Sequence, residues 1–203
     1  MSGQPRRTFA LGVAGVGIGL ALDACAGHPA PVSSPYSGDL RTVALAAALE
    51  NQAVSAYRAV DTALRAGRFG PAIPALSAFV QAATAHHVQH AASWNAILRN
   101  ARKPVVTGTP LSGNSDLMNS IQAASTVTDL VAAVHGMETQ AAQTHTAAVG
   151  NLTAAGPAVT AAATIAPVEA MHAAALGYLL SGKSSVVSFI GTGGALSTKA
   201  LTA

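Results

Sequence analysis

The chain has 203 residues, of which 50% are hydrophobic, 4% aromatic and only 9% charged. Eleven basic and eight acidic residues give a formal charge of +3, and the basic residues form no cluster interleaved with aromatic side chains, which argues against a nucleic-acid partner. Cys25 is the only cysteine, so zinc fingers, iron–sulfur clusters and cysteine nucleophiles are excluded from the rest of the chain.

Residues 1–25 are predicted to be an export signal. Arg6 and Arg7 precede an uncharged, Gly-rich stretch, residues 10–22, that is too short to anchor the chain across a bilayer. The paired arginines resemble a twin-arginine signal, and the sequence LDAC that ends at Cys25 resembles a lipobox. This resemblance implies a lipid anchor at Cys25 that holds the protein on the extracytoplasmic side of a membrane in the cell envelope. The alternative is simple cleavage at the small-x-small sequence around Cys25, which leaves a free secreted protein.

Residues 26–38 are rich in Pro and Ser without hydrophobic periodicity, and we predict a tether. A helical domain is expected over residues 39–182. Thr126 or Thr128 is expected to cap its third long helix, and Pro167 predicts a kink or a break just before Glu169. The expected long helices span about residues 39–66, 74–102, 126–152 and 157–180, with a weak short helix near residues 116–123.

Each long helix carries one apolar stripe at alternating three- and four-residue steps, which predicts a face buried between packed helices. The stripes run as far as residues such as Leu179, which is therefore expected in the core. Polar residues interrupt the stripes without leaving the buried face. They are Glu50 and Tyr57 in the first long helix, His87 and His90 in the second, Glu138 and His145 in the third, and Glu169 and His172 in the fourth.

The chain contains three glutamates, Glu50, Glu138 and Glu169, and all three lie on these stripes. Moving an ionised carboxylate out of water costs on the order of several kcal/mol unless a partner compensates. Few Lys or Arg residues lie on the stripes, so the partner must be a metal ion or an imidazole. The sequence therefore predicts a metal site between the helices. The alternative is a metal-free hydrogen-bond network, in which His172 bonds Glu169, and Tyr57 or His145 bonds the other two glutamates.

The arrangement of these residues is duplicated along the chain. Glu50 is followed seven residues later by Tyr57, and Glu138 seven residues later by His145. The pair His87-x-x-His90 in the second helix corresponds to Glu169-x-x-His172 in the fourth. The first two long helices therefore resemble the last two in the layout of their polar residues.

This layout resembles the ferritin-like superfamily, in which two helices supply one Glu each and the other two supply Glu-x-x-His. More narrowly, the chain is similar to exported bacterial ferritin-like domain proteins with twin-arginine signals. Over about residues 39–180 the resemblance implies an all-α, antiparallel four-helix bundle that commonly binds iron or manganese for oxidation chemistry, oxygen handling or iron storage. The ligands it implies are Glu50, His87, His90, Glu138, Glu169 and His172, with Tyr57 and His145 beside them.

His87 departs from the family pattern, which has Glu at that position. Three carboxylates leave a residual positive charge on two divalent ions, and the imidazole-rich set favours zinc, copper or a single iron. His86 is the alternative to His87 as a ligand, because it also lies within one helical arc of His90. We therefore expect an exported protein that binds one or two transition-metal ions, and a metal-dependent oxidoreductase if it is an enzyme. A rival hypothesis is a non-catalytic structural or interaction protein of the envelope with a degenerate metal site.

The C-terminal tail, residues 183–203, contains a β-branched run around Val186 and Val187. We expect this tail either to lie across the end of the helices or to support a homo-oligomer.

Overall fold

The computed structural model describes residues 34–183 and 189–203, and these residues fold into helices without a β-sheet. An isolated bridge between Leu111 and Leu201 is the nearest approach to a strand within those ranges. The all-α prediction is therefore confirmed. The predicted signal, the lipidation site at Cys25, the first part of the tether and the run at residues 184–188 lie outside the described residues. The helices are α1 (Asp39–Arg65), α2 (Pro74–Asn100), α3 (Asn114–Ala123), α4 (Val127–Asn151), α5 (Pro157–Ser181) and the short 3-10 helix η1 (Thr198–Ala200).

The helix ends agree with the sequence prediction to within about two residues and have local causes. Thr126 caps α4 through a capping box: its hydroxyl accepts from the backbone N–H of Asp129 at 3.1 Å, and the Asp129 carboxylate accepts from the Thr126 N–H at 2.9 Å. At the end of α5, Gly182 has a φ of 64°, the left-handed conformation that glycine adopts without steric cost.

Pro167 lies inside α5, but the helix continues from Pro157 to Ser181, so the predicted break is wrong. Pro167 lies on the exposed face, where water can replace the backbone hydrogen bond that proline cannot donate. Buried residues on either side, Ile165 and Glu169, hold both halves of the helix against its neighbours. Tertiary packing therefore outweighs the local effect of the proline.

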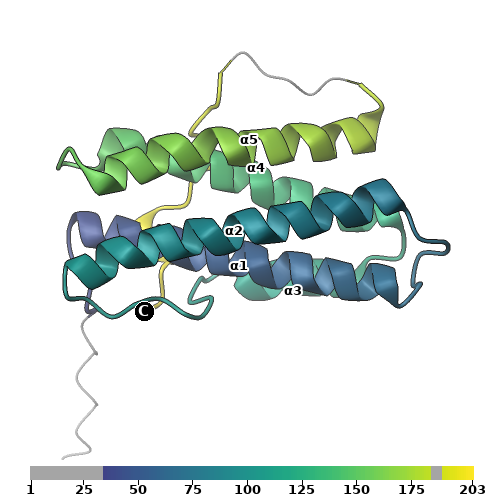
Figure 1. Ribbon diagram of the computed structural model, residues 1–203, viewed down its shortest axis with the longest axis horizontal. Coiled ribbons are helices and arrows are strands. Elements are labelled where there is room, and N and C mark those ends of the chain that lie inside the picture. The colour runs from purple at the N-terminus through teal and green to yellow at the C-terminus, as the bar shows by residue number, and fades with distance from the viewer. Residues whose placement is uncertain (1–33, 184–188) are drawn as a thin grey trace, which may run out of the picture. The chain divides into compact units, whose positions relative to one another are not determined.

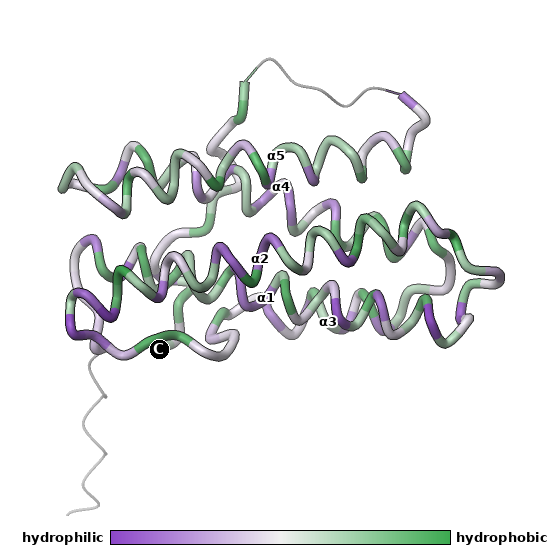
Figure 2. Tube along the Cα trace, in the orientation of Figure 1, coloured by the Kyte–Doolittle hydropathy of each residue, from purple (hydrophilic) through white to green (hydrophobic). Residues whose placement is uncertain are grey.

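The four long helices pack as two pairs, α1 with α2 and α4 with α5, and α1 contacts α4 while α2 contacts α5 (Figure 1). The short helix α3 packs against α4 and α1. In Figure 2 hydrophilic and hydrophobic residues alternate along α1 and α2, as expected for helices with one buried face, whereas α5 is mostly hydrophobic. By length and composition α5 could cross a membrane, a test that a core helix of a helical domain also passes.

Two apolar clusters fill the space between the long helices. The first contains Trp94 and Leu98 of α2, and the second contains Tyr57 of α1 and Leu130 of α4. In each long helix one cluster takes the residues before the candidate ligands and the other cluster takes the residues after them. The polar residues predicted from the stripes therefore lie between two dry apolar layers.

The C-terminal tail packs along α4 and α1 where the structure describes it. Leu196 donates its backbone N–H to the Thr144 hydroxyl at 2.9 Å, and Arg41 donates to the carbonyl oxygens of Thr198 and Leu201, each at 3.2 Å. Leu179 departs from the stripe prediction, because 54% of its surface is exposed near the end of α5. Its neighbours form an open apolar pocket there instead of a closed core.

Candidate metal centre

All six predicted ligands converge halfway along the four long helices, and each helix supplies at least one of them. Five are buried, and His90 is 13% exposed at the edge of the cluster. Residues three or four apart lie on the same side of a helix, so the candidate ligands lie on the buried faces and meet between the helices. Glu50 comes from α1, His87 and His90 from α2, Glu138 from α4, and Glu169 and His172 from α5.

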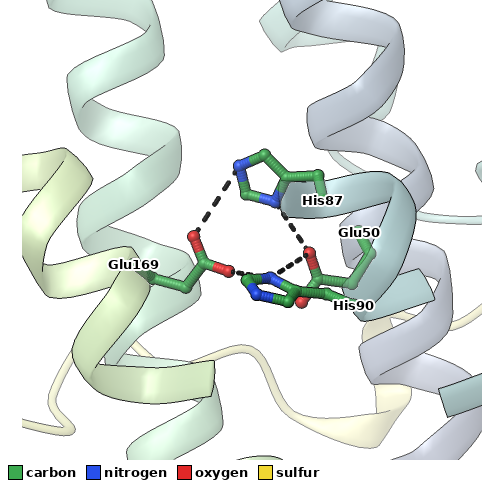
Figure 3. Close-up of side chains that lie close together, drawn as sticks. All are labelled: Glu50, His87, His90 and Glu169. Atoms are coloured by element: carbon green, nitrogen blue, oxygen red, sulfur yellow. Dashed lines mark hydrogen bonds and ion pairs between the residues drawn. The ribbon is translucent and has the colours of Figure 1, made fainter. Parts of the chain in front are cut away.

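Glu50, His87, His90 and Glu169 form one four-residue group (Figure 3). His87 Nδ1 lies 2.7 Å from Glu50 Oε2, and His90 Nδ1 lies 2.8 Å from Glu169 Oε1. The cross-distances are longer, at 3.5 Å from His90 Nδ1 to Glu50 Oε2 and 3.7 Å from His87 Nε2 to Glu169 Oε2. One donor atom from each residue lies within 4.8 Å of all the others, which is close enough for one metal ion to contact the four residues.

His87, Glu138, Glu169 and His172 form a second group with the same spacing. His87 Nε2 lies 3.1 Å from Glu138 Oε1, and His172 Nδ1 lies 3.1 Å from Glu169 Oε2 and 3.4 Å from Glu138 Oε1. The two groups share His87 and Glu169. His87 directs Nδ1 toward Glu50 in the first group and Nε2 toward Glu138 in the second.

Tyr57 and His145 each contact a glutamate from the opposite half of the chain. The Tyr57 hydroxyl of α1 donates to Glu138 Oε1 of α4, and the Tyr57 ring stacks on His87 with centroids 5.6 Å apart. His145 Nε2 of α4 lies 2.7 Å from Glu50 Oε1 of α1, although the two atoms are not aligned for a hydrogen bond. Both residues therefore lie beside the candidate ligands.

His86 lies on the outer side of the centre. Its Nδ1 is 3.0 Å from Nε2 of His172, and the two rings are nearly parallel with centroids 5.3 Å apart. His172 thus faces the glutamates with Nδ1 and His86 with Nε2. His87, and not His86, belongs to both four-residue groups.

The imidazoles at the centre are basic. Burial lowers the pKa of His90 and of His172, but hydrogen bonds and charges from the neighbouring glutamates outweigh it and raise each pKa to about 9. For His87 burial again opposes the charged form, yet Glu138 and Glu50 raise its pKa well above the ordinary value. At neutral pH these three imidazoles are therefore protonated without metal, and His172 donates its Nε2 proton to His86.

The glutamates respond in the opposite direction. Burial alone raises the pKa of Glu50, but contacts with His145, His87 and His90 lower it well below the usual range. The pKa of Glu138 is lowered in the same way by His87 and His172. Burial, followed by the charge on Glu138, raises the pKa of Tyr57, which keeps its hydroxyl protonated as a donor. Without metal the cluster is an ion-pair network in which imidazolium groups compensate acidic ones.

The network leaves acceptor atoms without donors, which is how these residues fit a metal ion. Within residues 34–183 and 189–203, Oε2 of Glu138 is buried and has no hydrogen-bond partner, and Oε1 of Glu50 has only the misaligned contact with His145. A buried carboxylate oxygen without a donor is costly, and a cation would satisfy it. Oxygen and imidazole-nitrogen donors suit iron, manganese, zinc and copper, so the donor set fits a transition metal without selecting one.

Phe79 is a neighbour of the centre that the sequence analysis did not identify. Its ring lies edge-on to Tyr57 and to His172, with centroids 6.2 Å and 5.8 Å away. Sequence reasoning could have identified Phe79 from its position in α2, because it lies seven residues before His86 and so on the same side of the helix.

Comparison with known proteins gives one match to a family. The family model described as a ferritin-like domain matches residues 38–182, which span α1 to α5 and contain every candidate ligand. No curated protein and no solved structure matches the chain. The match covers well over half of the sequence and coincides with the helices that build the centre. This chain therefore belongs to the ferritin-like domain family.

Proposed function

We propose that this protein binds one or two transition-metal ions between the helices of an antiparallel ferritin-like four-helix bundle. The observation that carries the proposal is the pair of four-residue groups that share His87 and Glu169. Their members come from four helices, five of the six are buried, and Oε2 of Glu138 has no hydrogen-bond partner among the described residues. Ordinary surface acidic clusters have neither property.

The order of the two apolar clusters along each helix supports the antiparallel arrangement. The apolar cluster that contains Trp94 comes before the candidate ligands along α1 and α5, and it comes after them along α2 and α4. Helices α1 and α2 therefore run in opposite directions through the same layers, and so do α4 and α5. In this topology the pair His87 and His90 of α2 lies opposite the pair Glu169 and His172 of α5.

The surrounding residues have distinct tasks in this proposal. Tyr57 donates to Glu138 and fixes the orientation of that carboxyl group. His86 accepts from Nε2 of His172 and directs Nδ1 of His172 inward. The apolar layers keep water from the donor atoms. A bound iron or manganese ion would supply one-electron redox chemistry, and a zinc ion would not.

Metal binding must displace protons from the centre. Because His87, His90 and His172 have raised pKa values, a metal ion replaces their protons when it coordinates the same nitrogens. Binding is therefore expected to release protons and to strengthen as the pH rises toward about 9, the pKa of His90 and His172.

Metal analysis with a matched pair of variants tests the proposal. Glu169→Gln keeps the side-chain size and removes one shared ligand, whereas Asp61→Asn removes an acid whose contact is with Arg65 on the surface. The folded protein should take up Fe, Mn, Zn or Cu and melt at a higher temperature with metal. Glu169→Gln should lose both effects and Asp61→Asn neither. Equal metal content and melting in all three proteins would contradict the proposal.

We propose further that residues 1–25 export the protein and that Cys25 anchors it to a membrane of the cell envelope. The twin-arginine-like start and the lipobox-like sequence before Cys25 support this. Metabolic labelling with a fatty acid, compared between the natural chain and Cys25→Ser, tests the anchor. Label in the natural chain alone is expected, and equal labelling or none would count against lipidation.

The second candidate function is a metal-free structural or interaction protein of the envelope. One observation favours it: the histidines and glutamates of the centre already compensate one another at distances of 2.7–3.1 Å. Oxygen uptake on addition of ferrous ion separates the two candidates. A redox centre predicts uptake that Glu169→Gln abolishes, whereas the structural candidate predicts no uptake and no bound metal in protein taken from its native envelope.

A further inference from the structure

An open apolar pocket lies between α2, α4 and α5, next to the candidate metal centre. Its volume is about 560 Å³, within the range of about 300–1,000 Å³ typical of small-molecule sites. Three of the eight large hydrophobic residues exposed in the described part of the chain line it, which concentrates exposed apolar surface at this point. These three are Ile73, Tyr178 and Leu179.

The pocket continues the helix faces that build the centre. On α5, Ala175 and Leu179 of the pocket follow His172 by three and seven residues and so share its face. On α4, Val131 precedes Glu138 by seven residues. Three residues of α-helix advance about 4.5 Å and seven about 10 Å, so the pocket begins about one turn from the nearest candidate ligand.

Phe79 stands between the pocket and the centre. It lines the pocket, and its ring contacts Tyr57 and His172, with centroid distances of 6.2 Å and 5.8 Å. Phe79 is only partly buried. A molecule in the pocket would therefore touch a side chain that itself touches a candidate ligand.

The lining defines the chemistry of the occupant. Among the described residues no charged side chain lines the pocket, and the polar side-chain groups there are the hydroxyls of Thr128 and Tyr178. An ion entering such a site would lose part of its hydration without gaining a charged partner, which is unfavourable. An uncharged molecule with a hydrocarbon chain or ring and one hydroxyl-like group matches this surface.

The concave, uncharged lining beside a site suited to metal favours a small ligand over a second copy of the chain.

We propose that this pocket binds an uncharged, mainly hydrocarbon small molecule and holds it against Phe79, beside the metal centre. That this molecule is the substrate of the centre rests on the proposed function. Its binding to the pocket does not, because the lining residues are separate from the ligands.

Displacement of a fluorescent probe tests the site in the metal-free protein. N-phenyl-1-naphthylamine, a neutral apolar dye, should bind with increased fluorescence, and 1-decanol should displace it at least tenfold more effectively than decanoate. Leu179→Glu places a charge in the pocket and should weaken dye binding at least tenfold. Met171→Glu is the matched control, because Met171 is an equally exposed apolar residue of α5, 59% against 54%, outside the pocket lining.

Nuclear magnetic resonance tests the position next to the centre without any metal. On addition of 1-decanol the imidazole signals of His172, which contacts Phe79, should shift, and those of His145, which stacks on Trp94 at 5.6 Å, should not. Equal dye binding by both Glu variants would overturn the pocket. Unmoved His172 signals would overturn its connection to the centre.

A second copy of the chain is the rival occupant. Sedimentation would overturn the proposal if it showed a dimer that does not bind the dye and that Leu179→Glu dissociates. Failure of metal binding alone would leave the dye and His172 results intact, so it would refute the proposed function and not the pocket. Metal binding without dye binding would refute the pocket and leave the proposed function intact.

Discussion

The two halves of the chain, α1–α2 and α4–α5, build the centre from the same pattern with different residues. In each half one helix supplies a single glutamate with a polar companion seven residues later, Glu50 with Tyr57 and Glu138 with His145. The companions are exchanged between the halves, because Tyr57 contacts Glu138 and His145 contacts Glu50. Neither half can therefore complete the centre alone.

The halves differ most at the two residues shared by both four-residue groups. His87 of α2 and Glu169 of α5 occupy equivalent positions, each three residues before a histidine. With histidine at one of them, each group contains two carboxyl groups and two imidazoles. This departure allows the residues to compensate one another without metal, whereas four carboxyl groups would depend more strongly on a cation.

The largest predicted effect comes from removing a glutamate that both halves use. In metal-free protein Glu138→Gln leaves the protonated His87 and His172 with one fewer buried carboxylate each, which should lower the free energy of unfolding by about 3–5 kcal/mol. Urea unfolding measures the loss. Asp116→Asn, on the exposed side of α3, is the control and should change stability little. A loss below about 1 kcal/mol would mean that water already screens the centre.

Restoring the symmetry of the halves is the next test. His87→Glu removes an imidazolium and adds a fourth acid, so the metal-free protein should lose on the order of 3 kcal/mol of stability. Added Mn or Fe should recover that loss and raise the number of bound ions toward two, measured by elemental analysis and thermal melting. If the variant is as stable as the natural protein without metal, His87 does not balance the glutamates.

Removing the contact between a companion residue and its glutamate is expected to cause a smaller loss of stability. Tyr57→Phe removes one hydroxyl that donates to a buried carboxylate, which should cost about 1.5–3 kcal/mol. Chemical unfolding of the metal-free protein measures it, with Tyr178→Phe as the control because that ring is 58% exposed. Equal effects of the two substitutions would show that the Tyr57 contact does not stabilise the fold.

The pH dependence of the metal-free protein is expected to be the most gradual effect, because His90, at the edge of the centre, and the buried His172 lose their protons over several pH units. Their pKa is raised from 6.5 to about 9, so the folded state binds extra protons between these values. Their contribution is complete below about pH 6.5 and is lost as the pH rises through about 9. The lowered pKa values of Glu50 and Glu138 cause a separate loss as the pH falls below about 4.5, their ordinary value. Melting temperatures measured in chelator from pH 3 to 10 should fall at both ends of this range. A melting temperature that stays constant as the pH rises to 10 would contradict the predicted contribution of His90 and His172.

Much of the fold was predictable because the determining interactions are local. The stripes at three- and four-residue steps fixed the four long helices, and the Thr126 capping box fixed where α4 begins. The six candidate ligands were predictable for a related reason: a glutamate or histidine on a buried stripe needs a partner, and the other stripes are where partners lie. A break at Pro167, one of the two outcomes expected there, does not occur, and Leu179 is exposed instead of buried, because both outcomes depend on which neighbours cover these residues.

The amino-acid sequence by itself determined the helices, their buried faces and the residues that must meet between them, because burial and helical periodicity act within one segment. Only the tertiary structure decided which glutamate each companion contacts, that His87 joins both groups while His86 supports His172, and that an apolar pocket ends at Phe79. These features depend on distances between helices, and no periodicity along one helix records the position of another.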